Sequence, residues 1–414
     1  MRIVIATAVY YPMINGVAVF SHNLAVGLAA RGHEVLVLCP SQTGKSYMEK
    51  VDGVETHYLK STEIKIYPDQ IHKVPEKRKF WYKYGFRASV FPGKEIRRIL
   101  DEFRPEVIHV QVSDPIGLSC VSYARRHNVP VVTTEHNQPE VLTEPLGLPK
   151  VIRRPTNALL AAYFVNRQSK SDFVTMPTEK AIKDLIWSRG REFKVPVAAV
   201  SNGVDLRRFK VGKADKKIYQ KYNLPSDAPI VLYVGRVDPE KKVGLVLEAF
   251  ERFLHNNKID KLSKTCLVVV GDGVDKNRLI KEAKRLGVDE NVKFLGKVLP
   301  PDLYELYKVG DVFATASEIE TQGIVLIEAA ATGLPLIAVD KGAVSEVCQD
   351  GINGVLCRPG DVAAIAEAIK QILGDEELRQ KYAEASLKIA SEHDFEKTLD
   401  KFINIYQKVI ADTL

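Results

Sequence analysis

The feature of the sequence that most constrains the fold is a regular alternation between short β-branched runs and segments with helical periodicity. Apolar residues recur at positions i, i+3, i+4 and i+7 in segments such as Ser21–Arg31 and Val362–Leu373. The runs between such segments are expected to be buried strands: Ile3–Ala8, Val35–Leu38, Val107–Val110, Val131–Thr134, Phe173–Met176, Val197–Ser201, Ile230–Gly235, Cys266–Gly271, Val292–Gly296, Val312–Ala316 and Leu336–Val339. This alternation predicts a doubly wound, parallel α/β architecture, and the pattern occurs twice.

The length of the chain indicates two domains. A chain of 414 residues with 45% hydrophobic content is too large for one hydrophobic core of ordinary size. The break is expected near residues 203–228, where a Lys-rich stretch leads into the turn-forming segment 225–229. We therefore predict an N-terminal domain over residues 1–205 and a C-terminal domain over residues 206–394. The closing helix, 395–414, has one apolar face and is expected to pack back on the N-terminal domain.

Composition argues against several classes of protein. The apolar runs are far shorter than the roughly 20 residues that cross a bilayer, so we expect neither a spanning helix nor a secretory signal. The five cysteines are scattered, odd in number and never spaced C-x-x-C, which argues against a disulfide framework and a zinc site. We expect reduced thiols, no metal, no cofactor and a cytoplasmic location.

The first candidate binding loop, residues 10–17, contains Gly16. It follows the first expected strand and precedes a helix, where open α/β sheets bind ligands and where helix amides suit a phosphate. A dinucleotide site would need G-x-G-x-x-G at this point, and only Gly16 is present, which weakens a nicotinamide-binding interpretation. A tight turn that binds nothing explains this stretch equally well.

A second candidate loop follows the first expected strand of the C-terminal domain. Arg236 and Lys241 leave the carboxyl end of that strand together, so both can face the inter-domain cleft. Two fixed cations there would neutralise a diphosphate leaving group in place of a metal ion. The alternative is an ordinary solvated, charged loop.

The strongest signal lies in residues 317–330, between an expected strand and a helix. Glu320 precedes the helix, where it and the amides of Gly323 and Ile324 can meet a hydroxylated ligand. Glu328 follows eight residues later inside an apolar run, and a buried carboxylate there needs a partner. A carboxylate accepts two hydroxyl hydrogen bonds at once, as a sugar diol or a ribose offers them. The alternative makes Glu320 a helix cap and Glu328 a solvated side chain.

These motifs together resemble glycosyltransferase family 4, whose members are retaining enzymes of the GT-B fold. The resemblance covers nearly the whole chain. Six features carry it, in the family's order: the Gly16 loop, Arg-Gly-His-Glu-Val at 31–35, Ser-Asn-Gly-Val-Asp at 201–205, Gly235-Arg236 with Lys241, Gly271-Asp272-Gly273, and the pair Glu320/Glu328. The resemblance implies two Rossmann-like domains facing a central cleft, with the acceptor bound by the N-terminal domain and the nucleotide sugar by the C-terminal one.

The resemblance also implies the donor contacts. Gly16 and the pair Arg236 and Lys241 would hold the diphosphate, and Glu328 would bind the ribose. The nucleobase would rest near residues 294–298, with Val298 in contact.

The sugar contacts follow in the same way. Glu320, with Gly323 and Ile324, would bind the transferred sugar, and His136 would lie over that sugar at the reacting face. A lone histidine is more often structural than catalytic, and the flanks of His136 leave its partner open. The diphosphate would depart from an oxocarbenium-like sugar, and the acceptor hydroxyl would attack on the same face. A glycosidase needs two carboxylates flanking the scissile bond, which the separation of Glu320 and Glu328 along a helix argues against.

Charge is unevenly distributed, and residues 73–98 concentrate it. Residues 1–200 contain 28 Lys/Arg and 19 Asp/Glu, a net charge of +9. Since the whole chain has a net charge of +7, residues 201–414 carry −2. Residues 73–98 have nine Lys/Arg and two Glu, interleaved with Phe80, Trp81, Tyr82, Tyr84, Phe86 and Phe91. This composition predicts peripheral binding to an anionic membrane surface. RNA binding and a solvated helix remain alternatives, although no nucleic-acid partner is expected.

The sequence thus predicts a retaining hexosyltransferase that moves a sugar, glucose first, from a UDP-sugar to a membrane lipid such as 1,2-diacylglycerol. Glu-Thr-Gln-Gly at 320–323 favours this acceptor, because the family members with the most similar motif are diacylglycerol glucosyltransferases. The main alternative is a GDP-mannose-dependent α-mannosyltransferase acting on phosphatidylinositol or a polyprenyl lipid. A non-catalytic sugar- or nucleotide-binding protein and a sugar-nucleotide epimerase are the alternatives of other classes. The expected location is the inner face of the cell membrane.

Overall fold

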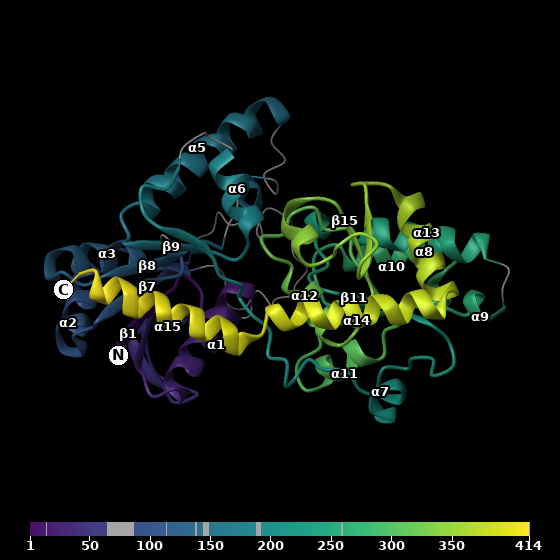
Figure 1. Ribbon diagram of the computed structural model, residues 1–414, viewed down its shortest axis with the longest axis horizontal. Helices are drawn as coiled ribbons and strands as arrows, with labels where there is room; N and C mark the ends of the chain where they lie inside the picture. Colours follow the sequence, from purple (N-terminus) through teal and green to yellow (C-terminus); the bar gives the residue numbers. More distant parts are fainter. Residues whose placement is uncertain are drawn as a thin grey trace. The chain divides into compact units, whose positions relative to one another are not determined.

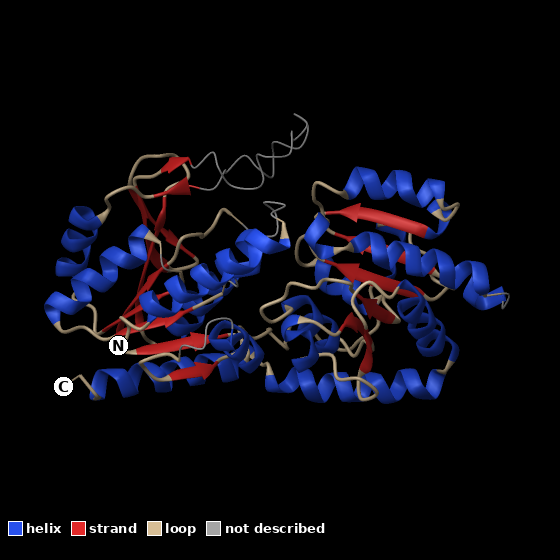
Figure 2. Ribbon diagram, turned by 90° about the horizontal axis from the view of Figure 1, so that it is seen from above, coloured by secondary structure: helices blue, strands red, loops and turns tan. Residues whose placement is uncertain are grey.

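The computed structural model divides the chain into two compact units, which are described separately (Figure 1). Unit 1 comprises Met1–Asn202 and Thr398–Leu414, and unit 2 comprises Gly203–Lys397. The structure describes residues 1–13, 15–63, 87–112, 114–136, 139–143, 149–187, 192–257 and 260–413. Each unit is a sheet with helices packed against it (Figure 2).

Unit 1 is built on an eight-stranded sheet with the order β10-β9-β8-β7-β1-β2-β4-β3, and every neighbouring pair is parallel except β3 with β4. Its strands are β1 (Arg2–Ala6), β2 (Glu34–Pro40), β3 (Tyr47–Val51), β4 (Val54–Leu59), β7 (Val107–Val110), β8 (Val131–Thr134), β9 (Phe173–Met176) and β10 (Val197–Ala199), with a separate pair β5 (Thr62–Glu63) and β6 (Arg87–Ala88). Its helices are α1 (Gly16–Ala30), α2 (Gly93–Phe103), α3 (Pro115–His127), α4 (Pro139–Thr143), α5 (Lys150–Gln168), α6 (Glu179–Trp187) and, from Thr398 on, α15 (Phe395–Ala411).

Unit 2 is built on a six-stranded, all-parallel sheet with the order β13-β12-β11-β14-β15-β16. Its strands are β11 (Ile230–Val234), β12 (Cys266–Val270), β13 (Val292–Gly296), β14 (Val312–Ala314), β15 (Leu336–Val339) and β16 (Gly354–Cys357). Its helices are α7 (Lys216–Lys221), α8 (Val243–Asn256), α9 (Asp260–Ser263), α10 (Lys276–Arg285), α11 (Asp302–Lys308), α12 (Ile324–Ala331), α13 (Val362–Gly374) and α14 (Glu376–Glu392), with 3-10 turns η4 (Pro239–Lys241), η5 (Asp289–Asn291) and η6 (Gly342–Glu346).

The sheet of unit 2 is buried on both faces, as parallel sheets usually are. Alternate residues of β12 belong to different cores: Leu267 and Val269 pack with α8, α10 and α13, whereas Val268 and Val270 pack with α7, α11, α12 and α14. Because successive side chains of a strand point to opposite faces, a continuous apolar run such as Cys266–Val270 requires cover on both sides.

The strand order fixes where loops can form a site. In unit 2 the order reverses between β11 and β14, and in unit 1 it reverses between β1 and β7. Ligands of open α/β sheets bind at such switch points, outside the carboxyl ends of the strands. The loop with Arg236 and Lys241 follows β11, the loop with Glu320 follows β14, and the loop before Gly16 follows β1.

The predicted parallel α/β architecture, present twice, is confirmed. Each of the eleven expected strands overlaps a strand of the structure, although several end a residue or two earlier, as β1 does at Ala6. The sequence did not predict β3–β6 and β16. The first helix also begins earlier than expected, at Gly16, because the Asn15 side chain accepts a hydrogen bond from the Ala18 amide and caps it.

Helix α15 packs on the sheet of unit 1 beside α1. Its Phe402 ring lies 5.9 Å from the ring of Phe20 in α1, and its Tyr406 hydroxyl lies 2.6 Å from Nδ1 of His109 in β7. Phe402 and Tyr406 are fully buried. The apolar face of the last helix is therefore buried within unit 1.

Candidate active site

The glycines of the segment 271–273 allow the loop after β11 to lie across the end of β12. A Cβ atom on Gly271 would lie 1.8 Å from the carbonyl oxygen of Gly235, and one on Gly273 would lie 2.2 Å from that of Val237. The Val237 amide donates to the Asp272 carbonyl (2.9 Å), which joins the two loops. The Gly-Asp-Gly motif therefore permits a backbone crossing that holds Arg236 at the edge of the sheet.

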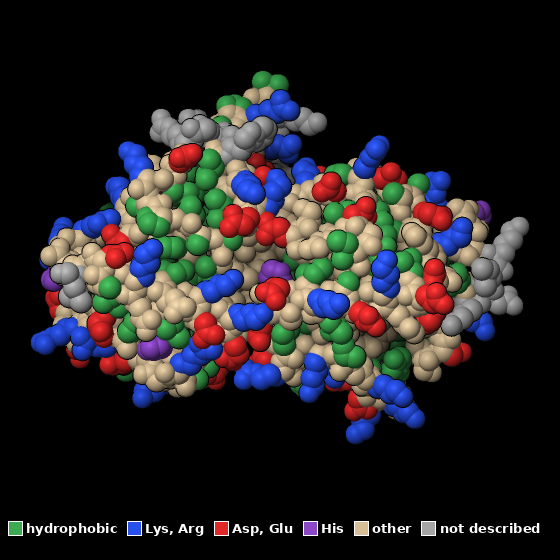
Figure 3. All heavy atoms as spheres, viewed as in Figure 1, with side chains coloured by type: hydrophobic (Ala, Val, Ile, Leu, Met, Phe, Trp, Pro, Cys, Tyr) green, Lys and Arg blue, Asp and Glu red, His purple; other side chains and the backbone are tan. Residues whose placement is uncertain are grey.

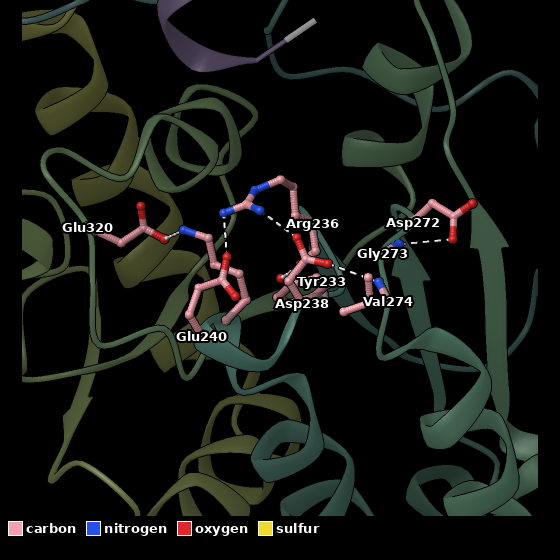
Figure 4. A network of polar contacts seen from close by, with 9 residues as sticks. Tyr233, Arg236, Asp238, Glu240, Asp272, Gly273, Val274 and Glu320 are labelled. Atoms are coloured by element: carbon pink, nitrogen blue, oxygen red, sulfur yellow. Dashed lines mark hydrogen bonds and ion pairs between the residues drawn. The ribbon is translucent and has the colours of Figure 1, made fainter. Parts of the chain in front are cut away.

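Arg236 is held by two carboxylates of its own loop (Figure 4). Its guanidinium donates to Asp238 Oδ2 and Glu240 Oε1, both at 2.5 Å. Asp238 is itself anchored, because its other oxygen accepts from the Val274 amide (2.9 Å). Burial raises the pKa of Asp238, and the charge of Arg236 opposes that shift. The sequence did not predict these partners, which fix the direction of the arginine.

Lys241 joins the β11 loop to the β14 loop. Its Nζ atom lies 2.6 Å from Glu320 Oε1, and both side chains are more than four-fifths buried. The two residues are 79 positions apart in the sequence. The structure therefore brings the lysine predicted to bind the diphosphate into direct contact with the glutamate predicted to bind the sugar.

A second ion-pair cluster, Lys242–Glu318–Lys341, supports the same loop. Glu318 accepts from Lys242 and, at 2.9 Å, from Lys341. Burial raises the pKa of Glu318, but the hydrogen bonds and charges of the two lysines outweigh it and lower the pKa overall. The carbonyl oxygen of Glu320 also accepts from the Ala343 amide (3.1 Å). These contacts fix the backbone on either side of Glu320, and sequence reasoning missed the whole cluster.

Gly323 starts helix α12 and places Glu328 inside unit 2. Gly323 has a left-handed backbone (φ +77°), which favours glycine, and no side chain caps the helix by a hydrogen bond there. Glu328 lies five residues further, about one and a half turns, and accepts a hydrogen bond from the hydroxyl of Tyr307 (2.5 Å). Burial raises the pKa of Glu328 to about 7, and the Tyr307 hydrogen bond offsets part of that shift. Tyr307 is the partner of this half-buried carboxyl group, and no pattern in the sequence indicated it.

Two other predicted donor contacts lie near strand ends. Ile324 is the first residue of α12 and is half-buried. Val298 follows β13, is half-buried and packs against the core that contains Val270 and Leu326. Val298 thus lies on the same edge of the unit 2 sheet as the loops of Arg236 and Glu320.

Gly16 is the first residue of α1 in unit 1. A Cβ atom there would have no neighbour within 4 Å, and its backbone is not left-handed. Packing in the described structure therefore does not require glycine at this position.

His136 follows β8 and is held by Gln111, which follows β7. Its Nε2 lies 2.8 Å from Gln111 Oε1, and its ring lies 5.2 Å from that of Phe20. A carbonyl oxygen can only accept, so Nε2 carries the proton and Nδ1 keeps its lone pair. Burial lowers the pKa of His136 to about 3, so the imidazole is neutral at physiological pH. Gln111 is the partner that the sequence left open.

A buried polar chain continues from Gln111 toward α15. His109 bonds Tyr406 through Nδ1 and Thr134 Oγ1 through Nε2, both at 2.6 Å, and Thr134 bonds Thr175 at 2.7 Å. The amide nitrogen of Gln111 lies 3.2 Å from both ring nitrogens of His109. Burial also lowers the pKa of His109 to about 3. The backbone around His136 is therefore fixed by β7, β8, β9 and α15 together.

The predicted membrane segment, 73–98, lies only partly within the described residues. Phe80, Trp81, Tyr82, Tyr84 and Phe86 lie outside them. Phe91, between β6 and α2, is 93% exposed. Lys94, Arg97 and Arg98 are exposed on α2.

Two sequence models of known protein families match this chain. The sequence model of "Glycosyltransferase Family 4" matches residues 14–208, and that of "Glycosyl transferases group 1" matches residues 214–389. The chain belongs to glycosyltransferase family 4. It is a nucleotide-sugar-dependent glycosyltransferase, and the predicted family is confirmed.

Several curated relatives are similar over nearly the whole chain. The alpha-monoglucosyldiacylglycerol synthase of Streptococcus pneumoniae is 28% identical over 99% of this chain and 88% of the relative, and that of Acholeplasma laidlawii is 28% identical over 86% and 84%. A glycogen synthase of Mycobacterium tuberculosis is 26% identical over 98% of this chain and 94% of the relative. The GDP-mannose-dependent alpha-mannosyltransferase of the same organism is 27% identical over 99% and 97%. Family membership therefore leaves donor and acceptor to be established.

Solved structures agree on the fold. The sucrose-phosphate synthase of Thermosynechococcus elongatus matches with a TM-score of 0.75 at 19% identity, over all of both chains. Anabaena HepE in complex with UDP-glucose matches with a TM-score of 0.71 at 18% identity, over 99% of this chain and all of the other. The fold of this glycosyltransferase is GT-B.

No helix in the described part of the chain is both long and apolar enough to span a bilayer. Nor do its His, Cys, Asp and Glu side chains form a group of three or more that could hold a metal ion.

Proposed function

We propose that this glycosyltransferase is a retaining hexosyltransferase that transfers glucose from UDP-glucose to a membrane lipid of the 1,2-diacylglycerol type. The contact between Lys241 and Glu320, formed where the strand order of unit 2 reverses, carries the proposal. It sets a cation for the diphosphate beside a carboxylate for the sugar. The donor is assigned to unit 2 and the acceptor to unit 1.

Arg236 and Lys241 stabilise the leaving group. Each is paired with carboxylates: Lys241, which is largely buried, with Glu320, and Arg236, which is exposed, with Asp238 and Glu240. A diphosphate offers Lys241 a more highly charged partner than Glu320. The cations then stabilise the charge that develops on the departing UDP, and in this proposal they replace a metal ion. We assign the Gly16 loop of unit 1 to the same diphosphate.

Glu320 and Glu328 bind hydroxyl groups of the donor. When Lys241 moves to the diphosphate, both oxygens of Glu320 become available for sugar hydroxyls. The Gly323 and Ile324 amides at the start of α12 add donors that no side-chain cap occupies. Glu328, with one oxygen held by Tyr307, binds the ribose.

Retention follows from attack on the face that the diphosphate leaves. The acceptor hydroxyl then lies next to the departing phosphate oxygen, which takes its proton, and no covalent enzyme intermediate is needed. We assign His136 to the reacting face of the sugar; its neutral imidazole can accept a hydrogen bond at Nδ1. It therefore positions a hydroxyl and does not act as a cationic acid.

The acceptor assignment is supported by the relatives named alpha-monoglucosyldiacylglycerol synthase. The uneven charge, +9 over residues 1–200, suits an anionic leaflet. We place the protein at the inner face of the cell membrane, with residues 73–98 in peripheral contact and no nucleic-acid partner. The alternative is a GDP-mannose-dependent enzyme acting on phosphatidylinositol or a polyprenyl lipid, since one relative is named a GDP-mannose-dependent alpha-mannosyltransferase.

The pKa of Glu328 predicts how donor binding depends on pH. Only the ionised carboxylate accepts two ribose hydroxyls, and its pKa is about 7. The ionised fraction rises roughly tenfold from pH 6 to pH 8, so we expect the KM for the donor to fall by up to about tenfold over that range. Initial rates against donor concentration measure this. Glu328→Gln should raise KM and abolish the dependence, and an unchanged profile in that variant would assign it to another group.

A donor and acceptor panel tests the function itself. The protein is incubated with radiolabelled UDP-glucose, UDP-galactose or GDP-mannose, and with diacylglycerol, phosphatidylinositol, polyprenyl phosphate or glycogen. We expect label from UDP-glucose in the organic phase with diacylglycerol, as an α-glycoside by NMR, and activity that persists in a chelator. Label from GDP-mannose would establish the alternative, label in glycogen would exclude a lipid acceptor, and a β-linked product from an α-linked donor would exclude retention.

A further inference from the structure

In the described part of the chain, helix α5 of unit 1 has one apolar face with exposed side chains. Four of its large apolar side chains are solvent-exposed: Val151 (85%), Leu159 (64%), Ile152 (53%) and Tyr163 (44%). Pro155, between them, is also exposed. At about 100° per residue these five positions fall within an arc of about 120°. They form one continuous stripe, which we call the α5 stripe.

The stripe belongs to a helix that is firmly attached by its other side. Ala161, Phe164 and Val165 are buried in a cluster with α6 and β9. At the far end of the helix, the Gln168 amide donates to Glu135, the residue before His136. The exposed face is therefore held in a fixed direction, on the helix that also contacts the sugar-facing loop of the proposed site.

The charge of the helix indicates what the stripe meets. The sequence of α5 contains four Lys/Arg and no Asp or Glu. Arg154 is exposed next to Pro155, and the Arg167 guanidinium lies 5.2 Å from the centre of the Tyr163 ring. From the neighbouring α4, Glu140 faces the helix and accepts from Asn157 (3.1 Å). An apolar stripe flanked by arginines is typical of helices that lie in the headgroup layer of an anionic bilayer.

The outer surface shows the same combination of side chains. Hydrophobic and Lys/Arg side chains lie together at the projecting edge of unit 1 where α5 is found in the ribbon view (Figures 1 and 3). Exposed apolar residues grouped in this way mark interaction surfaces in water-soluble domains.

We propose that α5 docks on an anionic lipid bilayer, with the α5 stripe inserted at the level of the headgroups and Arg153, Arg154 and Arg167 on lipid phosphates. This docking surface rests on the proposed function, because an enzyme that glucosylates a membrane lipid must reach the bilayer. In this orientation the helix on the membrane is the one whose Gln168 donates a hydrogen bond to Glu135, the residue before His136. In the sequence, α5 is a separate segment from residues 73–98.

Vesicle cosedimentation tests the docking. Phosphatidylglycerol vesicles without diacylglycerol are used, with phosphatidylcholine vesicles as the uncharged comparison. We expect Val151→Gln/Leu159→Gln to lower the partition coefficient at least about tenfold, and Arg153→Gln/Arg154→Gln to lower it on phosphatidylglycerol in a salt-sensitive way. The matched control is Val211→Gln/Leu299→Gln, because these unit 2 residues are 59% and 51% exposed. Binding of the α5 variants at the wild-type level would overturn the proposal. If Arg97→Gln/Arg98→Gln then abolishes binding, the membrane contact belongs to α2 instead.

A label on the stripe gives a second, independent measurement. The five native cysteines are all buried, so Val151→Cys can be labelled selectively with an environment-sensitive fluorophore. Insertion predicts a blue-shifted, brighter emission with phosphatidylglycerol vesicles, and Val211→Cys should show none. An unchanged spectrum at Val151, or a dimer in sedimentation velocity that buries the label without lipid, would contradict insertion.

The assay with a water-soluble acceptor separates this proposal from the proposed function. On short-chain diacylglycerol in solution the α5 variants should retain wild-type turnover, while their activity on vesicles falls. If no lipid accepts glucose yet vesicle binding still depends on α5, the enzymatic proposal fails and the docking stands. If the α5 variants glucosylate vesicle lipid like the wild type, the docking fails and the enzymatic proposal stands.

Discussion

Replacement of Lys241 by alanine is expected to lower kcat at least about 100-fold, with a smaller effect on the KM for the donor. Lys241 contributes most when the UDP leaves, because negative charge then develops on the diphosphate. Without the donor its charge is satisfied by Glu320 at 2.6 Å, and in the donor complex it is satisfied by the intact diphosphate, which carries less charge than the departing UDP. Its contribution therefore differs between the ground state and the transition state, which is the condition for an effect on kcat.

Lys308→Ala is the matched control for this experiment. Lys308 forms an ion pair of the same length with Glu305, 2.6 Å, in the same unit, and its side chain is 13% exposed against 18% for Lys241. Both variants remove a largely buried cation, so thermal unfolding should shift to a similar extent. Initial rates at saturating donor then isolate the catalytic effect. A kcat for Lys241→Ala within about threefold of that for Lys308→Ala would remove Lys241 from the mechanism.

Replacement of Gly271 by alanine is expected to destabilise unit 2 by at least about 3 kcal/mol. The new Cβ would lie 1.8 Å from the carbonyl oxygen and 2.9 Å from the carbonyl carbon of Gly235. Because both atoms belong to the backbone at the end of β11, no side-chain rotation relieves the clash. The backbone φ of +141° adds strain for any residue with a Cβ.

Urea unfolding followed by fluorescence and circular dichroism measures this loss of stability. Gly287→Ala is the control, since Gly287 also has a positive φ (+71°) but no atom lies within 4 Å of its Cβ position. It should cost only about 1–2 kcal/mol, the usual penalty of a left-handed backbone. If the two alanine variants unfold at the same urea concentration, the crossing of Gly271 over Gly235 does not limit what this position accepts.

Much of the fold could be predicted because central strands of parallel sheets are buried on both faces. Runs such as Cys266–Val270 are apolar throughout, so they stand out from the helical periodicity around them. Strands β3 and β4 lie at the edge of the unit 1 sheet and mix polar with apolar residues, as in Val54–Leu59. Their sequence does not separate them from loops, and only the pairing of β4 with β2 and of β3 with β4 makes them strands.

In the candidate site, too, some residues could be predicted from the sequence and others could not. Motif spacing indicated Arg236, Lys241, Glu320 and Glu328, because their loops follow strands and precede helices. It did not indicate Tyr307, Gln111 or Glu318, whose functional neighbours lie 21 or more positions away in the sequence. Such contacts depend on how strands are ordered in a sheet, which local patterns do not encode.

The sequence by itself determined the class of fold, because it follows from residue types repeated at short, regular spacing, and its ordered motifs resemble the family that the sequence models match. The tertiary structure decided which charges neutralise one another, which carboxyl group is buried beside a hydroxyl, and which face of α5 stays uncovered. The physical reason is range: hydrophobic periodicity acts over a few residues, whereas ion pairs such as Lys241–Glu320 and the burial of Glu328 exist only after distant segments have packed together.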